Sequence, residues 1–186
     1  MSDSIASFTA SELRKLRSMK DPYGIQKFVD DAPYHLADTA WSPRRVLAEQ
    51  TAHCLEGAIF AAAALRANGY PPLLLDFEAE HDTDHVIAIF RQNRCWGAVA
   101  KSNYTGCRWR EPVHRTLREL AISYFNGYFN LRRERTLRRF SFPEFALGCR
   151  RSLSSMPCPV TRKPDRTSAT RSKSSSRMAA AMIVVF

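Results

Sequence analysis

The feature that most constrains the fold is an alanine-rich apolar segment at residues 52–68, AHCLEGAIFAAAALRAN. Its larger apolar residues recur at helical spacing, and the alanines on the other faces are typical of a helix surrounded by neighbouring elements. Gly69 suits the left-handed conformation that ends a helix, and Pro71 and Pro72 prevent continuation. The sequence therefore predicts a central helix that the rest of the domain must cover.

Three short strands are predicted after this helix, at residues 73–77, 85–91 and 95–99. The turn between the last two is expected at Gln92 and Asn93, and so short a connection indicates an antiparallel hairpin. Shorter amphipathic helices are predicted around this block, at residues 11–17, 22–31, from 43 onward and 114–128. We therefore expect an α+β domain over residues 1–149, with the central helix packed on a small antiparallel sheet.

The basic charge of the chain is concentrated at its C-terminal end. Residues 150–186 hold eight basic side chains and one acidic one, so they carry +7 of the total +10, and residues 1–149 carry +3. Serine and proline are frequent in this tail, and few of its residues are apolar, so we expect it to be disordered and not to pack on the domain. An altered reading frame is one hypothesis for its origin; it would leave Phe140 and Phe142 exposed.

Composition also limits the cellular compartments and the kinds of binding partner that we expect for this protein. No apolar run reaches the length of a transmembrane helix, and residues 1–19 lack the apolar core of a secretion signal. The five cysteines are odd in number and form no C-x-x-C pair, which indicates neither a disulfide framework nor a zinc ribbon. We expect a cytoplasmic protein with no membrane partner. Residues 1–149 carry nearly equal numbers of basic and acidic side chains, so we do not expect this domain to bind nucleic acid. Binding of nucleic acid through the basic tail is a less favoured alternative.

Cys54 is a candidate nucleophile because it lies in the first turn of the central helix. The backbone N–H groups there are unpaired and the helix dipole stabilises a thiolate. His85 opens a strand about thirty residues later and is the candidate general base. Asn103 is the candidate for the residue that orients the imidazole, with Ser102 as the weaker choice. Packing roles for Cys54 and His85 explain the same residues without chemistry.

The order of these residues resembles a known family. The stretches H53-C-L-E-G-A-I-F-A-A-A-A-L-R-A-N-G-Y-P-P72, D84-H-V-I-A-I-F90 and W96-G-A-V-A-K-S-N103 are similar to the transglutaminase-like, papain-like cysteine superfamily. The likeness extends over residues 24–143 and is strongest to an uncharacterised group of bacterial transglutaminase-like proteins. The superfamily usually has an Asp four residues after the strand tryptophan, where this chain has Ala100.

The resemblance implies a papain-like core and a cysteine hydrolase or acyltransferase that acts on a peptide or amide substrate. Cys54 would be the nucleophile, His85 the base and Asn103 the orienting residue, and no cofactor would be needed. A catalytically silent interaction domain that keeps the same scaffold is the alternative.

Three other groups of residues could carry chemistry. Two histidines and two aspartates within residues 81–85 could ligate a cation, but an exposed acidic loop explains the same letters, and we expect no metal. Gln50 could lend an amide to an oxyanion hole, although a solvated helix end explains it as well. The arginines of residues 132–139 could contact phosphates, but such a run is more often a solvated face.

Overall fold

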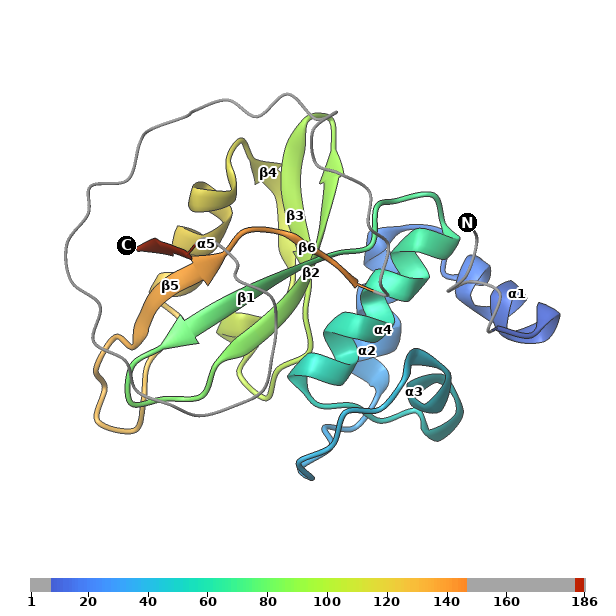
Figure 1. Cartoon of the computed structure of the whole chain (residues 1–186), viewed down its shortest axis with the longest axis horizontal. Coiled ribbons are helices and arrows are strands. Elements are labelled where there is room, and N and C mark those ends of the chain that lie inside the picture. Colours follow the sequence, from blue (N-terminus) through green and yellow to red (C-terminus); the bar gives the residue numbers. More distant parts are fainter. Residues whose placement is uncertain (1–7, 147–182, 186) are drawn as a thin grey trace.

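The computed structural model describes residues 8–146 and the backbone of residues 183–185 (Figure 1). Within these ranges the helices are α1 (Ala10–Ser18), α2 (Pro22–Asp31), α3 (Pro43–Glu49), α4 (Cys54–Ala67), the 3₁₀ turn η1 (Thr105–Cys107) and α5 (Leu117–Phe125). The strands are β1 (Leu73–Ala79), β2 (His85–Gln92), β3 (Cys95–Val99), β4 (Arg110–His114), β5 (Leu137–Ser141), β6 (Glu144–Phe145) and β7 (Ile183–Val185). The expected α+β class is confirmed.

The strands form one sheet in the order β4-β3-β2-β1-β5-β7, with β6 also paired to β1. All of these pairings are antiparallel. The sheet has more strands than the three that were predicted. The sequence did not predict β4 (REPVH) and β5 (LRRFS), because neither contains a run of apolar residues. Tertiary pairing with β3 and β1, rather than local propensity, makes these two segments extended.

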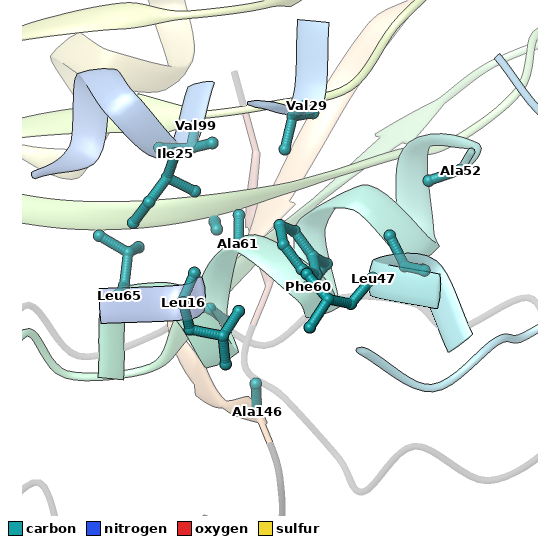
Figure 2. Packing of buried hydrophobic residues seen from close by; sticks show 14 of the residues in the cluster. Leu16, Ile25, Val29, Leu47, Ala52, Phe60, Ala61, Leu65, Val99 and Ala146 are labelled. Carbon is teal, nitrogen blue, oxygen red and sulfur yellow. The ribbon is translucent and has the colours of Figure 1, made fainter. Parts of the chain in front are cut away.

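The sheet is packed on both faces. Helix α4 lies against one face over β2, α2 contacts β3, and α1 and α3 pack on α4. Figure 2 shows Phe60 and Leu65 of α4 and Val99 of β3 in this layer; Ala88 and Phe90 of β2 belong to the same cluster. Helix α5 lies against the other face, where Leu120 packs with the alternate residues of the strands. Because successive residues of a strand point to opposite faces, β2 needs apolar residues on both, and Ile87 to Phe90 are all buried.

The central helix has the position that the sequence predicted. At 14 residues α4 is the longest helix of residues 8–146. None of the helices in the described ranges is long and apolar enough to cross a membrane. Its C-terminus closes with the Gly69 N–H donating to Arg66 O and the Tyr70 N–H donating to Leu65 O, the paired bonds of a Schellman motif. Gly69 has φ +89°, which explains why the stop occurs at a glycine.

The hairpin between β2 and β3 turns one residue later than expected. Asn93 and Arg94 form the turn, with φ of +49° and +64°. Two successive positive φ values are the mark of the two-residue turn whose twist matches the flanking strands. Gln92 instead pairs with Cys95 as the last residue of β2.

The expectation that nothing beyond about residue 150 packs on the domain is wrong at three residues. Strand β7 pairs with β5 in the register Arg139 to Val185, Phe140 to Val184 and Ser141 to Ile183. The rest of the expected tail lies outside the described residues. Phe140 is not exposed: only 4% of its surface is accessible, because β5 is joined to β1 and its phenyl ring faces the α5 side of the sheet. Phe142 is 39% exposed.

Candidate active site

A cavity of about 90 Å³ lies beside the N-terminus of α4, at the end of the sheet where β2 begins. Its walls come from separate parts of the chain: Tyr34, Cys54, residues 82–85, residues 102–104 with Cys107, and residues 127–129. The four residues singled out in the sequence, Cys54, His85, Ser102 and Asn103, all line this cavity. Segments far apart in the chain therefore meet where a thiol and an imidazole border the same space.

Cys54 is the first residue of α4 and is half-buried. The first hydrogen bond of the helix runs from the Gly57 N–H to His53 O at 2.8 Å. The backbone N–H groups that precede Gly57 in the first turn therefore have no carbonyl partner within the helix. Tyr34 reaches this helix start. Burial raises the pKa of Tyr34, the nearby Cys54 thiol raises it further, and a hydrogen bond from the Cys54 backbone N–H opposes the rise. No motif in the sequence points to this tyrosine.

His85 is held in one tautomer. Its side chain is buried, and Nε2 lies 2.9 Å from the carbonyl oxygen of Cys107. Because a carbonyl only accepts, Nε2 carries the proton and Nδ1 keeps a free lone pair in the neutral ring. Burial lowers the pKa of His85 to about 4, with Arg110 acting in the same direction and the Cys107 carbonyl opposing it. The imidazole is therefore neutral near pH 7 and able to accept a proton.

The orienting partner of His85 is a backbone carbonyl rather than the side chain expected from the sequence. Cys107 O makes the contact that was predicted for Asn103. Asn103 is exposed at the cavity wall, and the Ser102 hydroxyl accepts the Tyr104 backbone N–H at 3.0 Å. The turn η1 ends at Cys107, which is buried with its carbonyl oxygen at the ring, whereas the Asn103 side chain is exposed. Every residue has a main-chain carbonyl oxygen, so no sequence motif could have predicted this contact.

Glu56 is a buried carboxylate directly beneath the start of α4. Its side chain has no accessible surface, and it accepts hydrogen bonds from the Thr39 hydroxyl, the Trp41 N–H at 3.0 Å, the His53 N–H at 3.2 Å and His35 Nδ1 at 3.2 Å. Burial alone would raise the pKa of Glu56, but these donors outweigh it and lower the pKa to about 2. The carboxylate therefore ties the loop of residues 35–41 to the first turn of α4.

His53, the N-cap residue, is directed toward this loop. Its Nε2 lies 2.6 Å from the carbonyl oxygen of Thr39 and 3.5 Å from Glu56 Oε1. The ring of His35 stacks at a tilt on Trp41, with centroids 4.1 Å apart. His53 therefore supports the helix start through the loop of residues 35–41 and Glu56.

The end of β3 is anchored by two buried polar side chains. Gln26 of α2 pairs with the backbone of Ala100, donating from Nε2 to the carbonyl at 3.0 Å and accepting the N–H at 2.9 Å. Lys101 Nζ donates to Val29 O at 2.8 Å and to Ala32 O, at the C-terminal end of α2 where the helix dipole favours a cation. These bonds fix the segment that carries Ser102 and Asn103 into the cavity wall.

The close packing of Lys101 against α4 requires a glycine at position 57, and this leads to a first prediction. A Cβ added at Gly57 would lie 2.5 Å from Lys101 Cβ and 3.2 Å from its Cγ, so α4 or the Lys101 backbone would have to move. Gly57→Ala should lower the free energy of unfolding by about 1–3 kcal/mol despite the better helix propensity of alanine. Urea denaturation measures this. In a Lys101→Gly background the same substitution should cost less, and an equal cost in both backgrounds would contradict the proposed contact.

The other three groups considered from the sequence, residues 81–85, Gln50 and the arginines of residues 132–139, do not form a further catalytic or metal site. Among the described residues no group of three or more His, Cys, Asp or Glu side chains is placed to hold a metal ion. Gln50 is exposed, ends α3 with φ +54° and does not line the cavity. Two arginines of β5 pair with carboxylates of the neighbouring segment, Arg138 with Glu80 at 2.9 Å and Arg139 with Glu78 at 3.1 Å.

The cavity thus brings together a half-buried thiol at a helix start, a neutral imidazole with a fixed tautomer and a set of wall residues from distant segments. Such an arrangement has the parts needed for nucleophilic chemistry on a carbonyl group. Comparison with known proteins adds no relative: no protein-family model matches the chain, and no curated protein matches it either.

Proposed function

We propose that the protein is a transglutaminase-like cysteine hydrolase or acyltransferase that acts on an amide. The observation that carries the proposal is the cavity shared by Cys54, in the first turn of α4, and His85, whose Nε2 is committed to a carbonyl. A thiol at a helix start that shares a cavity with a neutral imidazole is a pairing that thiol nucleophiles use. The packing of α4 against an antiparallel sheet supports a papain-like assignment of the core.

The reaction would begin when Cys54 Sγ attacks the carbonyl carbon of the amide. The thiol proton passes to Nδ1 of His85, and the negative charge on the carbonyl oxygen is stabilised by backbone N–H groups of the first turn of α4. Collapse of this intermediate breaks the carbon–nitrogen bond, and the amine leaves with the proton that His85 returns. The resulting thioester on Cys54 is then attacked by water or by an amine.

Two features of the site support particular roles. The carbonyl of Cys107 would keep the His85 ring oriented, and it would stabilise the imidazolium while the proton resides on Nδ1. Tyr34 contacts the Cys54 N–H, so the substrate carbonyl would displace its hydroxyl to reach that amide. The three cysteines in the described ranges are free, which fits the proposal of a reducing, cytoplasmic compartment.

The test is a comparison of alkylation by iodoacetamide near neutral pH, quantified for each cysteine by peptide mass spectrometry. Cys54 should react faster than Cys95, which is also half-buried but lies on β3 away from the cavity. His85→Ala should slow the reaction of Cys54 by about tenfold, because the thiol loses its base. The rate at Cys95 serves as the internal control and should be unchanged. Equal rates at Cys54 in both proteins would contradict the proposal.

A catalytically silent interaction domain is the second candidate, and one observation favours it. Burial lowers the pKa of His85 to about 4, which makes the ring a weak base. Cys54 in such a domain would be alkylated no faster than Cys95. The same experiment therefore separates the two functions.

A further inference from the structure

A second, larger cavity of about 530 Å³ adjoins the cavity beside Cys54. The two share four wall residues, Asp82, Thr83, Tyr104 and Phe129. The volume lies within the range of 300–1,000 Å³ that small-molecule sites occupy. A ligand whose reacting group enters the smaller cavity would therefore place its neighbouring part in the larger one.

The larger cavity is where exposed apolar side chains gather. Of the eight large hydrophobic side chains that are exposed in the described ranges, three line it: Tyr104 at 65%, Phe129 at 49% and Leu131 at 99% exposure. Keeping a leucine wholly in water costs free energy that its burial would recover. Apolar side chains grouped at the rim of a cavity mark a binding surface, whereas single ones elsewhere need no explanation.

The loop that presents Leu131 is held in place by its own hydrogen bonds. Asn130 Oδ1 accepts the backbone N–H groups of Arg132 at 2.9 Å and Glu134 at 3.1 Å, and Asn130 Nδ2 donates to the Glu134 carboxylate at 2.8 Å. The Arg135 guanidinium lies 5.5 Å from the centroid of the Phe129 ring. The exposed leucine is therefore a fixed feature of the loop, and a preorganised surface loses little entropy on binding.

The carboxylate of the shared wall is already engaged within the protein. Asp82 Oδ2 accepts from the Thr136 hydroxyl at 2.8 Å, and Oδ1 accepts from the Thr83 N–H at 2.8 Å. Of the other polar wall residues, the Asn130 side chain is bonded within its own loop and His81 Nε2 lies 4.0 Å from Glu80 Oε1, while Arg132 completes the wall. Tyr104, Phe129 and Leu131 supply the apolar part of the wall, which a ligand would cover.

From these observations we infer that the larger cavity is the subsite for a bulky apolar side chain next to the scissile amide, so that the substrate is an amide of an aromatic or large aliphatic acyl unit. This inference rests on the proposed function. The acyl carbonyl would stand at Cys54, and the apolar side chain would cover Leu131 and Phe129 and exclude water from them.

The test measures binding to the full-length Cys54→Ala protein, which cannot turn the ligand over. N-acetyl-L-phenylalaninamide and N-acetyl-L-alaninamide are titrated separately, and affinity is followed by NMR shifts of the protein amides. The phenylalanine compound should bind about tenfold more tightly or better, as expected for a side chain of that size in an apolar site. Shifts should include residues 129–132. Equal affinities would overturn the inference.

Leu131→Ser, made in the same Cys54→Ala protein, should reduce that preference by about three- to tenfold. Leu36→Ser is the matched control, since Leu36 is 86% exposed and lines neither cavity; the preference should stay unchanged. Both side chains are exposed, so neither variant threatens the fold. An unaltered preference in Leu131→Ser would overturn the inference, and so would a change in sedimentation that identifies this surface as a contact between two copies of the chain.

These outcomes are distinguishable from a failure of the proposed function. The binding measurement uses a protein without the thiol, so it does not depend on the reactivity of Cys54. Selective alkylation of Cys54 together with no preference for phenylalanine would refute the subsite alone. Preference for phenylalanine without selective alkylation would refute the reaction, and with it the assignment of the ligand as a substrate.

Discussion

Replacing Glu56 with Gln is expected to lower the free energy of unfolding by about 2–4 kcal/mol. The carboxylate is fully buried and accepts from four donors, and an amide keeps only one acceptor oxygen while adding an N–H group to a site full of donors. Equilibrium urea denaturation at pH 7 measures the change. Glu49→Gln is the matched control, because Glu49 is an exposed glutamate at the end of α3; it should change the value by less than about 0.5 kcal/mol.

The effect of Glu56 should also depend on pH in a defined direction. Its pKa in the folded protein is about 2, below the usual 4.5, so the unfolded chain takes up the proton first as pH falls. The stabilisation by Glu56 is complete above pH 4.5 and is lost as the pH falls toward 2. The difference between the wild type and Glu56→Gln should therefore shrink over that window. A difference that stays constant would show that the charge of Glu56 does not matter.

The wild-type protein is expected to lose about 3 kcal/mol of stability between pH 6.5 and pH 4 because of His85 alone. Burial lowers the folded-state pKa of this histidine from 6.5 to about 4, so in this window the unfolded chain binds the proton and the folded protein does not. In His85→Gln this component should be absent, since glutamine does not titrate and can still donate to the Cys107 carbonyl. Urea denaturation at several pH values in this range measures both proteins.

The comparison must be made between the two proteins rather than from one pH curve. Burial raises the pKa of Asp76 to about 6, with Asp84, Glu144 and Glu78 acting in the same direction, so Asp76 favours folding as the pH falls and opposes the trend of His85. This contribution is common to the wild type and His85→Gln and cancels in their difference. Parallel stability curves for the two proteins would refute the prediction for His85.

The elements that the sequence predicted correctly are those whose signal is local. The central helix has its periodic apolar residues and its stop at Gly69, and the hairpin of β2 and β3 has two apolar runs joined by a short turn. Strand β5 was missed because its sequence is LRRFS. Leu137 and Phe140 are buried but do not alternate, and the arginines between them pair with carboxylates of a segment about sixty residues away.

Some residues of the candidate site could likewise be predicted from local sequence, and others could not. Cys54 and His85 could be proposed from the sequence because each occupies a recognisable position, at a helix start and at a strand start. The partner of His85 could not be, since the atom that contacts the ring is a main-chain oxygen available at every residue. Tyr34 was missed for a different reason. It lies in an irregular segment, and its approach to Cys54 depends on the bridge between Tyr34 and Ala52.

The cavity beside Cys54 is assembled from segments between Tyr34 and Phe129, so its parts are joined by long stretches of chain. Contacts of high sequence separation form late in folding because the loop entropy must be overcome before they stabilise anything. The hairpin of β2 and β3 can form early, whereas the meeting of Cys54 with residues 102–104 and 127–129 needs nearly the whole domain in place. The environment of Cys54 therefore records the completion of folding, and its rate of alkylation during refolding would follow the final step rather than the collapse that precedes it.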